Sequence, residues 1–479
     1  MHFVDILIFI VYFSLMLGIG LYFFRRNKNI EDYYIGGRSM GSWHIGLSVV
    51  ATDVGGGFSI GLGGLGYIIG LAGSWMLFTG LIGAWLSAVL LIPVIHRLSK
   101  EKMFFTFPQV FEHYYTGKVA LIAGIISAIG YTGFTSSQLL AGAKLASATF
   151  VEINLLTALV IMGVIAVVYT GIGGLKAVIY TDTVQWIILM AGLIFIGIPI
   201  AYNAIGGIES IKSTLGHEFL SLGNIQWQQL VNWAVTIIPI WFVGMTLYQR
   251  IYASRTKKQA QKAWFIAGLF EWPVMAFMGV LLGLFSRVAF EQGMFSDLGY
   301  PVGAEMDAEM GLPILLNTVL PVGLTGIILA AYFSAILSTA DSCLMAASGN
   351  VQTDIMDKFL PGKRSLKGNL RLSQLITLSI GVLALFLASY MTNVLDLMLY
   401  SYAFMVSGLF VPIIAALFSR SPSTLAAIIA MISGGTTTIA LIVTDINLPF
   451  DLDANIFGIG TSALLYILIY IIEKNINGK

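Results

Sequence analysis

Charge is scarce in this sequence. Asp, Glu, Lys and Arg make up only 10% of the 479 residues and the formal net charge is +1, so nothing in the composition points to a nucleic-acid partner. Apolar residues dominate instead. They amount to 57% of the chain, and the mean hydropathy of +0.88 lies far outside the range of soluble proteins. The composition therefore predicts a protein that crosses a membrane many times.

Cysteine is almost absent as well. The single residue Cys343 excludes a disulfide framework, and no Cys and His residues have the spacing of a metal site. The longest hydrophilic stretches have about 20 residues and no HExxH motif occurs, so neither a soluble catalytic domain nor a metalloprotease of the membrane is indicated. We therefore do not expect an enzyme.

Apolar runs of about 20 or more residues recur along the chain, and each is long enough to cross a membrane as a helix. They cover residues 4–24, 42–68, 73–96, 119–149, 153–171, 178–204, 229–248, 263–289, 312–347, 372–391, 395–419, 423–444 and 455–473. The first run is followed by Arg25 and Arg26 without a cleavage site, so we expect it to be retained. These runs predict an all-α protein with about 13 transmembrane helices.

The basic residues predict the orientation, because cytoplasmic loops retain Lys and Arg. With the N-terminus outside, nearly all basic residues fall in cytoplasmic loops. The opposite loops at 291–310 and 444–455 are acidic and contain neither Lys nor Arg. An odd number of spans then places the C-terminus in the cytoplasm. We expect a multi-pass protein of the plasma (cell inner) membrane, surrounded by lipid, and the sequence does not indicate an oligomeric state.

Ionisable residues inside the predicted spans are the most informative ones, because a charge at the bilayer centre costs at least about 2.5–3.5 kcal/mol and is usually functional or paired. They are Asp53, Lys144, Asp182, Glu271, Asp341 and Asp396. Lys144, Asp182 and Asp396 fall near predicted span ends, where an interfacial role is the alternative. Glu271 precedes Pro273 and could be a structural partner at a kink.

The stretch 51–64, ATDVGGGFSIGLGG, is unusual for a membrane helix. Each glycine lowers helix stability by about 1 kcal/mol relative to Ala, so we expect the helix to break near 53–57. Unwound backbone at this depth must line protein or a water-filled cavity, where its carbonyl groups can coordinate a cation. The alternative is that the glycines permit close helix packing, which explains Gly61 and Gly64 but not Asp53.

A second polar cluster lies in the stretch 330–350. Ala335, Ser338 and Thr339 share one helix face, and Ser338, Asp341 and Ser342 share an adjoining face. Hydroxyl and carboxylate oxygens suit a hard cation such as Na⁺. The alternative is that the hydroxyl groups only bond back to carbonyls of their own helix.

Four separated segments resemble the sodium/solute symporter family, which includes sodium/glucose, sodium/proline, sialic acid and choline transporters. The segments are 31–57, 168–189, 248–263 and 330–355. Of these, 248–263 is similar to a cytoplasmic loop of the family. The resemblance implies secondary active symport of sodium and a small organic solute into the cytoplasm by alternating access. It also implies the leucine-transporter fold, in which two five-helix repeats of opposite topology place their sites near the midplane.

The same resemblance implies the division of the chain. An extra first helix at 4–24 would precede repeat one at 42–204 and repeat two at 229–419, and two peripheral helices would follow at 423–473. The main sodium site would be formed by the carbonyls of Ala51, Val54 and Ala335 and the hydroxyls of Ser338 and Thr339. A second sodium site would be formed by Asp182, Ser338, Asp341 and Ser342.

The solute is less defined. ATDVGGG resembles the choline transporters, which cage a quaternary ammonium with aromatic residues. Here Thr135 and Gly244 or Met245 stand where aromatic residues are expected. We expect a small organic solute and favour a cation or a zwitterion. The candidate solute-binding residues are Asp53, Gly55, Gly56, Phe58, Trp75, Trp241, Phe242 and Tyr400.

Several alternatives stay open at this point. Asp53 could serve a cationic solute, an ion or a buried partner such as Lys144. Asp53, Asp182 and Asp341 could also relay protons, which makes proton-coupled symport the alternative within the same fold. A membrane sensor that keeps the transporter fold is a further alternative.

Overall fold

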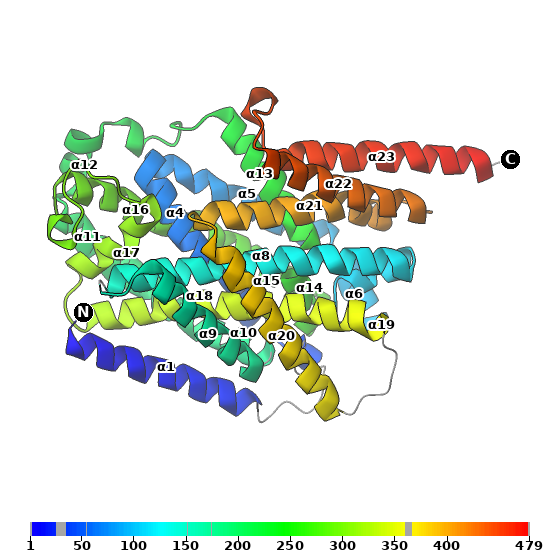
Figure 1. The fold of residues 1–479 in the computed structure, drawn as a ribbon, viewed down its shortest axis with the longest axis horizontal. Coiled ribbons are helices and arrows are strands. Elements are labelled where there is room, and N and C mark those ends of the chain that lie inside the picture. The colour runs from blue at the N-terminus through cyan, green and yellow to red at the C-terminus, as the bar shows by residue number, and fades with distance from the viewer. Residues whose placement is uncertain are drawn as a thin grey trace.

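The computed structural model describes residues 2–24, 35–53, 55–150, 152–173, 175–359 and 366–477. Over these ranges the chain is a bundle of helices, most of which run along one common direction (Figure 1). The described part contains no β-strand, only an isolated bridge between Met40 and Ser254. The two ends of the chain lie at opposite ends of the bundle (Figure 1).

The helices follow one another with short connections. They are α1 (Phe3–Phe24), α3 (Ser42–Asp53), α4 (Gly55–Ile69), α5 (Trp75–Leu90), α6 (Ile92–Lys102), α7 (Pro108–Tyr114), α8 (Gly117–Thr149), α9 (Leu155–Gly173), α10 (Leu175–Gly192), α11 (Ile198–Ala204), α12 (Gly207–Leu215), α13 (Trp227–Val243), α14 (Met245–Ala253), α15 (Lys257–Leu269), α16 (Ala276–Glu291), α17 (Ala308–Val319), α18 (Leu324–Gly349), α19 (Asp357–Phe359), α20 (Leu366–Ser389), α21 (Val394–Phe418), α22 (Thr424–Thr444) and α23 (Ala454–Asn477). Three π-helical segments interrupt this order, η3 (Leu193–Gly197), η5 (Phe270–Met275) and η7 (Asn350–Met356).

Within the described ranges, nine helices are long and apolar enough to cross a membrane, and the bent pair α13 and α14 raises the number to ten. The helices at α1 and α9 contribute shorter apolar stretches. The all-α membrane architecture is therefore confirmed, whereas the expected count of thirteen spans is not.

Several predicted spans are divided in the structure. The run 312–347 is not one helix, because α17 ends at Val319 and α18 begins at Leu324. Pro321 and Gly323 separate them, and Gly323 has a φ of +90°, which glycine adopts without strain. The run 229–248 bends by 43° at Gly244, between α13 and α14.

The segment 248–263 is not simply a cytoplasmic loop. Its first part continues as α14 to Ala253, and every residue of α14 is buried. A short connection then leads into α15, which begins at Lys257. The basic residue at position 250, counted with the loops on the sequence alone, therefore lies inside the bundle.

The predicted break in the glycine-rich stretch is confirmed. Helix α3 ends at Asp53 and α4 begins at Gly55, which has a φ of +51°. Val54 lies outside the described residues. Glycines further along α4 permit close packing instead, because a Cβ atom at Gly66 would lie 2.1 Å from the carbonyl oxygen of Val280 in α16. Both explanations of the glycines therefore apply, at different positions.

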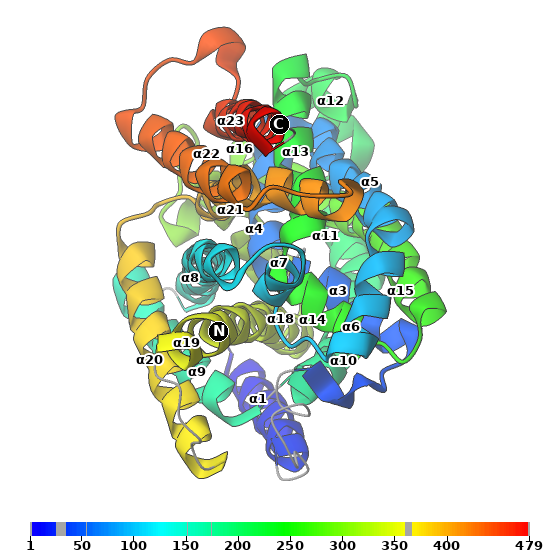
Figure 2. The ribbon, with the colours of Figure 1, turned by 90° about the vertical axis from the view of Figure 1, so that its right-hand side faces the viewer.

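Helix α18 carries the second polar cluster and lies inside the bundle. In its most apolar window 94% of the residues are buried, whereas the peripheral helix α23 reaches only 22%. The view along the bundle shows α18 between α8 and α14, with α22 and α23 to one side (Figure 2). Its polar side chains therefore face protein rather than lipid.

Candidate functional site

The end of α3 meets the middle of α18 at the predicted main sodium site. The hydroxyl oxygen of Thr339 lies 3.0 Å from the carbonyl oxygens of both Ala51 and Ala335. The hydroxyl of Ser338 lies 3.0 Å from the same Ala335 oxygen. Four of the five predicted ligands are thus brought together, and the fifth, Val54, lies outside the described residues.

These contacts test the two explanations of the hydroxyl groups. Both hydroxyls donate back to a carbonyl of their own helix, as Ser and Thr often do in membrane helices. Thr339 also reaches across to α3, which back-bonding alone does not require. Gly55, the first residue of α4, also lies close to this hydroxyl, since a Cβ atom at Gly55 would be 3.0 Å from the Thr339 hydroxyl oxygen. Carbonyl and hydroxyl oxygens without nitrogen or sulfur fit Na⁺.

The acidic residues of the second predicted site lie beside the first. The Ser48 hydroxyl donates to Asp182 Oδ2 over 2.6 Å, and the Thr170 hydroxyl donates to Asp341 Oδ1. The other carboxylate oxygens, Asp182 Oδ1 and Asp341 Oδ2, are buried and have no hydrogen-bond partner in the described part of the chain. An unpaired carboxylate oxygen is costly in a dry interior, so this region favours a cation.

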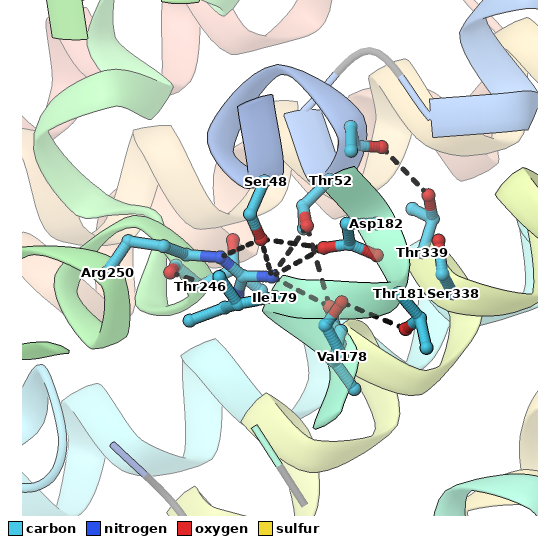
Figure 3. A network of polar contacts seen from close by, with 12 residues as sticks. Ser48, Thr52, Val178, Ile179, Thr181, Asp182, Thr246, Arg250, Ser338 and Thr339 are labelled. Carbon is cyan, nitrogen blue, oxygen red and sulfur yellow. Dashed lines mark hydrogen bonds and ion pairs between the residues drawn. The ribbon is translucent and has the colours of Figure 1, made fainter. Parts of the chain in front are cut away.

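Arg250 was missed on the sequence and is central in the structure. This fully buried side chain extends from α14 into the bundle (Figure 3). Its Nη2 atom lies 2.7 Å from the Thr52 hydroxyl, 2.9 Å from the Ser342 hydroxyl and 3.7 Å from Asp182 Oδ2. One guanidinium group therefore joins α3, α10, α14 and α18. The only sequence signal was an arginine directly after an apolar run.

Asp53 and Glu271 approach each other at the other side of the helix break. Their carboxyl groups are neighbours, and Tyr402 is a further neighbour of Asp53. Lys144 is not the partner of Asp53, so that alternative is wrong. The Lys144 ammonium instead lies 2.6 Å from carboxylate oxygens of Glu309 and Asp307.

The predicted aromatic residues are not gathered into a cage. Trp241 is buried against Trp264, with ring centroids 6.3 Å apart, and Phe242 lies 5.9 Å from a different ring, that of Phe410. The Trp75 indole donates to a carbonyl of the segment before α13, and Tyr400 is 44% exposed on α21. Gly56 follows Gly55 in α4, and the side chain of Phe58 lies outside the described part.

The sequence was compared with protein families and with known proteins. Residues 33–434 match the model of the sodium:solute symporter family. The sodium/glucose cotransporter of Vibrio parahaemolyticus is 29% identical over 391 residues, which are 75% of this chain and 70% of the relative. The sodium/proline symporter of Escherichia coli is 28% identical over 82% of this chain and 79% of its own length. The high-affinity proline transporter of Bacillus subtilis is 27% identical over 88% of this chain and 89% of its own length.

Solved structures agree on the fold. A Na⁺-coupled sialic acid symporter in a substrate-bound, outward-open state superposes with a TM-score of 0.78 at 20% identity, covering 98% of this chain and 97% of that one. A nucleobase-cation-symport transporter in a closed conformation gives a TM-score of 0.59 at 13% identity, covering 93% of this chain and 96% of that one. Fold and family model together identify a multi-pass membrane transporter that couples a solute to sodium, and not an enzyme. The chain belongs to the sodium:solute symporter family.

Proposed function

We propose that this protein carries a small cationic or zwitterionic solute into the cytoplasm together with sodium, by alternating access. The observation that carries the proposal is the convergence of the Ala51 and Ala335 carbonyls on the hydroxyl of Thr339. These groups belong to α3 and α18, which are far apart in the sequence. A sodium ion bound between them would hold one arrangement of the two helices.

Sodium can drive the cycle only by binding one conformation more tightly than the other. We propose that it stabilises the outward-facing state, in which the solute site is accessible. In a cytoplasm that contains little sodium, its release would loosen the contact of α3 with α18 and allow the solute to leave.

The proposal extends to the organisation of the chain. Residues 42–204 and 229–419 would be the two inverted repeats, with 4–24 and 423–473 as peripheral helices. The proposed orientation places the N-terminus outside and the C-terminus in the cytoplasm. The opposite positions of the two ends in the bundle support an odd number of crossings (Figure 1).

The test is direct binding of radioactive sodium to purified protein. Replacing Ser338 and Thr339 together by Ala should abolish binding at the main site, because both hydroxyl ligands are lost. Ser348→Ala is the matched control, since Ser348 is a buried serine of the same helix whose hydroxyl, among the described residues, bonds only to the Met345 carbonyl. Undiminished sodium binding in the double variant would refute this site.

A second sodium ion is also proposed. Asp182 and Asp341 each keep one carboxylate oxygen without a donor, and Arg250 is the buried base beside them in the described part. Two carboxylates and one guanidinium leave one negative charge that a further cation can neutralise. Ser338 and Ser342 would supply the hydroxyl ligands.

Proton-coupled symport is the alternative function, and it is supported by the unpaired carboxylate oxygens in this region. The same unpaired oxygens of Asp182 and Asp341 could each hold a proton instead of sharing a sodium ion. Sodium and pH gradients imposed separately on proteoliposomes distinguish the two. Solute uptake that responds to the pH gradient and ignores sodium would support proton coupling.

The solute class follows from the similarity and from Asp53 together. The relatives are named for glucose and proline. A buried carboxyl group at the helix break favours a positively charged nitrogen over a sugar, and a proline-like zwitterion satisfies this requirement. Of the aromatic residues predicted for a quaternary ammonium, Trp241 and Phe242 pack against different rings and not against each other.

A further inference from the structure

Glu271 is an unusual residue for a membrane span. It lies in the π-helical segment η5, where Trp272 leaves the helical region with φ of −136° and ψ of 123°. The side chain is fully buried, and neither carboxylate oxygen accepts a hydrogen bond from an N–H or O–H donor in the described residues. Such π segments are frequent at functional sites. A structural role at the kink would require a partner, and the described part offers no donor.

The neighbouring helix makes room for this carboxyl group. A Cβ atom at Gly80 in α5 would lie 2.0 Å from Glu271 Oε2, so a larger residue at this position would require the carboxyl group to move. Glycine costs helix stability at such a position. The close approach places the Glu271 carboxyl group against the backbone of α5.

The group that Glu271 faces is another acid. Asp53 is its neighbour, at the end of α3, and Asp53 keeps 6% of its surface exposed. The buried basic side chains of the described part are engaged elsewhere. Lys144 binds Glu309, Arg250 binds the Asp182 region, and Arg38 binds the Ser99 hydroxyl and the Phe104 carbonyl.

Two carboxyl groups this close in a dry site cannot both be ionised without a cation, because like charges repel strongly at low dielectric. With one shared proton the pair keeps a single negative charge and still presents acceptor oxygens. One cationic group with N–H donors would neutralise the charge and fill the acceptors. A neutral sugar would leave the charge unpaired.

We propose that Asp53 and Glu271 together bind the protonated nitrogen of the transported solute, with Glu271 as a residue that determines specificity for an ammonium group. The proposal rests on the proposed function, since it places the solute at the helix break of α3 and α4. It adds the second carboxyl group and narrows the solute to one that carries N–H donors on its positive nitrogen.

Methylammonium chloride is the probe, added at constant sodium to purified protein while thermal unfolding is recorded. Binding to the folded state raises the unfolding temperature, and the concentration dependence gives the affinity. We expect methylammonium to stabilise the wild type, tetramethylammonium to stabilise it less, and D-glucose to have no effect. Glu271→Gln should weaken methylammonium binding by about 10-fold or more.

Control variants separate this site from other effects. Glu291→Gln removes an acid that pairs with Arg287 at the end of α16, and should bind methylammonium like the wild type. If Glu271→Gln does not fold, Glu271→Asp keeps the charge on a shorter side chain and should bind more weakly than the wild type. No stabilisation of the wild type by methylammonium, or equal stabilisation of the Glu271 variant, would overturn the proposal.

Sodium binding distinguishes a failure of this proposal from a failure of the proposed function. Glu271→Gln should retain stabilisation by sodium, whereas the double variant of Ser338 and Thr339 should lose it. If sodium fails to stabilise the wild type, the symport proposal fails while the methylammonium result still decides the role of the carboxyl pair. If Glu271→Gln loses sodium binding and keeps methylammonium binding, the pair is an ion site and the ammonium proposal is refuted.

Discussion

Lys144 and Glu309 form a buried ion pair in which 2.6 Å separates Nζ from Oε2, with the two side chains 1% and 4% exposed. The Glu309 carboxylate also accepts hydrogen bonds from the backbone N–H groups of Val394 and Leu395, over 2.8 and 3.0 Å. A single carboxylate therefore ties α8, α17 and the first turn of α21 together. Asp307, also 2.6 Å from Nζ, completes the cluster.

Replacing Lys144 by Ala should strongly destabilise the protein. Removing one partner of a buried ion pair leaves the other charge uncompensated, which costs about 3–5 kcal/mol. Thermal unfolding in detergent measures the loss. Lys212→Ala is the control, because Lys212 is exposed and its pair with Glu209 at 3.4 Å should contribute little. Equal unfolding temperatures for the two variants would contradict the structural role of Lys144.

The deficit of Lys144→Ala should depend on pH. Burial raises the pKa of Glu309 above its ordinary value, and Lys144 opposes this rise. Without Lys144 the pKa rises further, so the folded state binds a proton that the unfolded state releases. Stability then falls as pH rises through the raised pKa. The variant should be closer to the wild type in acid than at neutral pH, and a deficit independent of pH would argue against a charged Glu309.

Gly66→Ala should loosen the contact of α4 with α16. The added Cβ atom would lie 2.1 Å from the Val280 carbonyl oxygen, so the helices must separate, at a cost of about 1–3 kcal/mol. At Gly460 in α23 nothing lies within 4 Å, and Gly460→Ala should be neutral or slightly stabilising. The unfolding temperatures of the two variants decide the question. A tolerated Gly66→Ala would show that this packing can relax.

Arg250 and Asp182 should be energetically coupled. Arg250→Gln alone leaves the buried Asp182 carboxylate without its nearby positive charge, and Asp182→Asn alone leaves the guanidinium with less compensation. The double variant removes both charges, so its loss of stability should be smaller than the sum of the two single losses. A double-mutant cycle on thermal unfolding measures the coupling, and strictly additive losses would indicate that the charges do not interact.

Local patterns in the sequence predict the ligands that are close along the chain. The spacing of Ala335, Ser338 and Thr339 places them on one helix face, and the glycine run after Asp53 predicts the break that frees nearby backbone. The first feature depends on the spacing of side chains along a helix and the second on the low helix propensity of glycine. Both can be read from the local sequence. What the pattern could not give is which carbonyl Thr339 would reach, namely that of Ala51.

Contacts between distant elements were not predictable in this way. Arg250 was counted with loop residues because its partners Thr52, Ser342 and Asp182 stand on three other helices. Glu309 lies at the end of the acidic stretch 291–310, and nothing in that stretch predicts its pairing with Lys144. In each case the pairing is set by how helices far apart in the sequence pack, which no single-span pattern contains.

The proposed second sodium ion makes the last prediction. Asp341 belongs only to the second set of ligands and Thr339 only to the main set, so single variants can separate the two ions. Asp341→Asn should reduce the amount of radioactive sodium bound at saturation by about half, because a neutral amide no longer compensates a second charge. Thr339→Ala should weaken the main site and leave the other intact. Binding of one ion to the wild type, unchanged by Asp341→Asn, would exclude the second site and leave the pair of Asp182 and Asp341 to hold a proton.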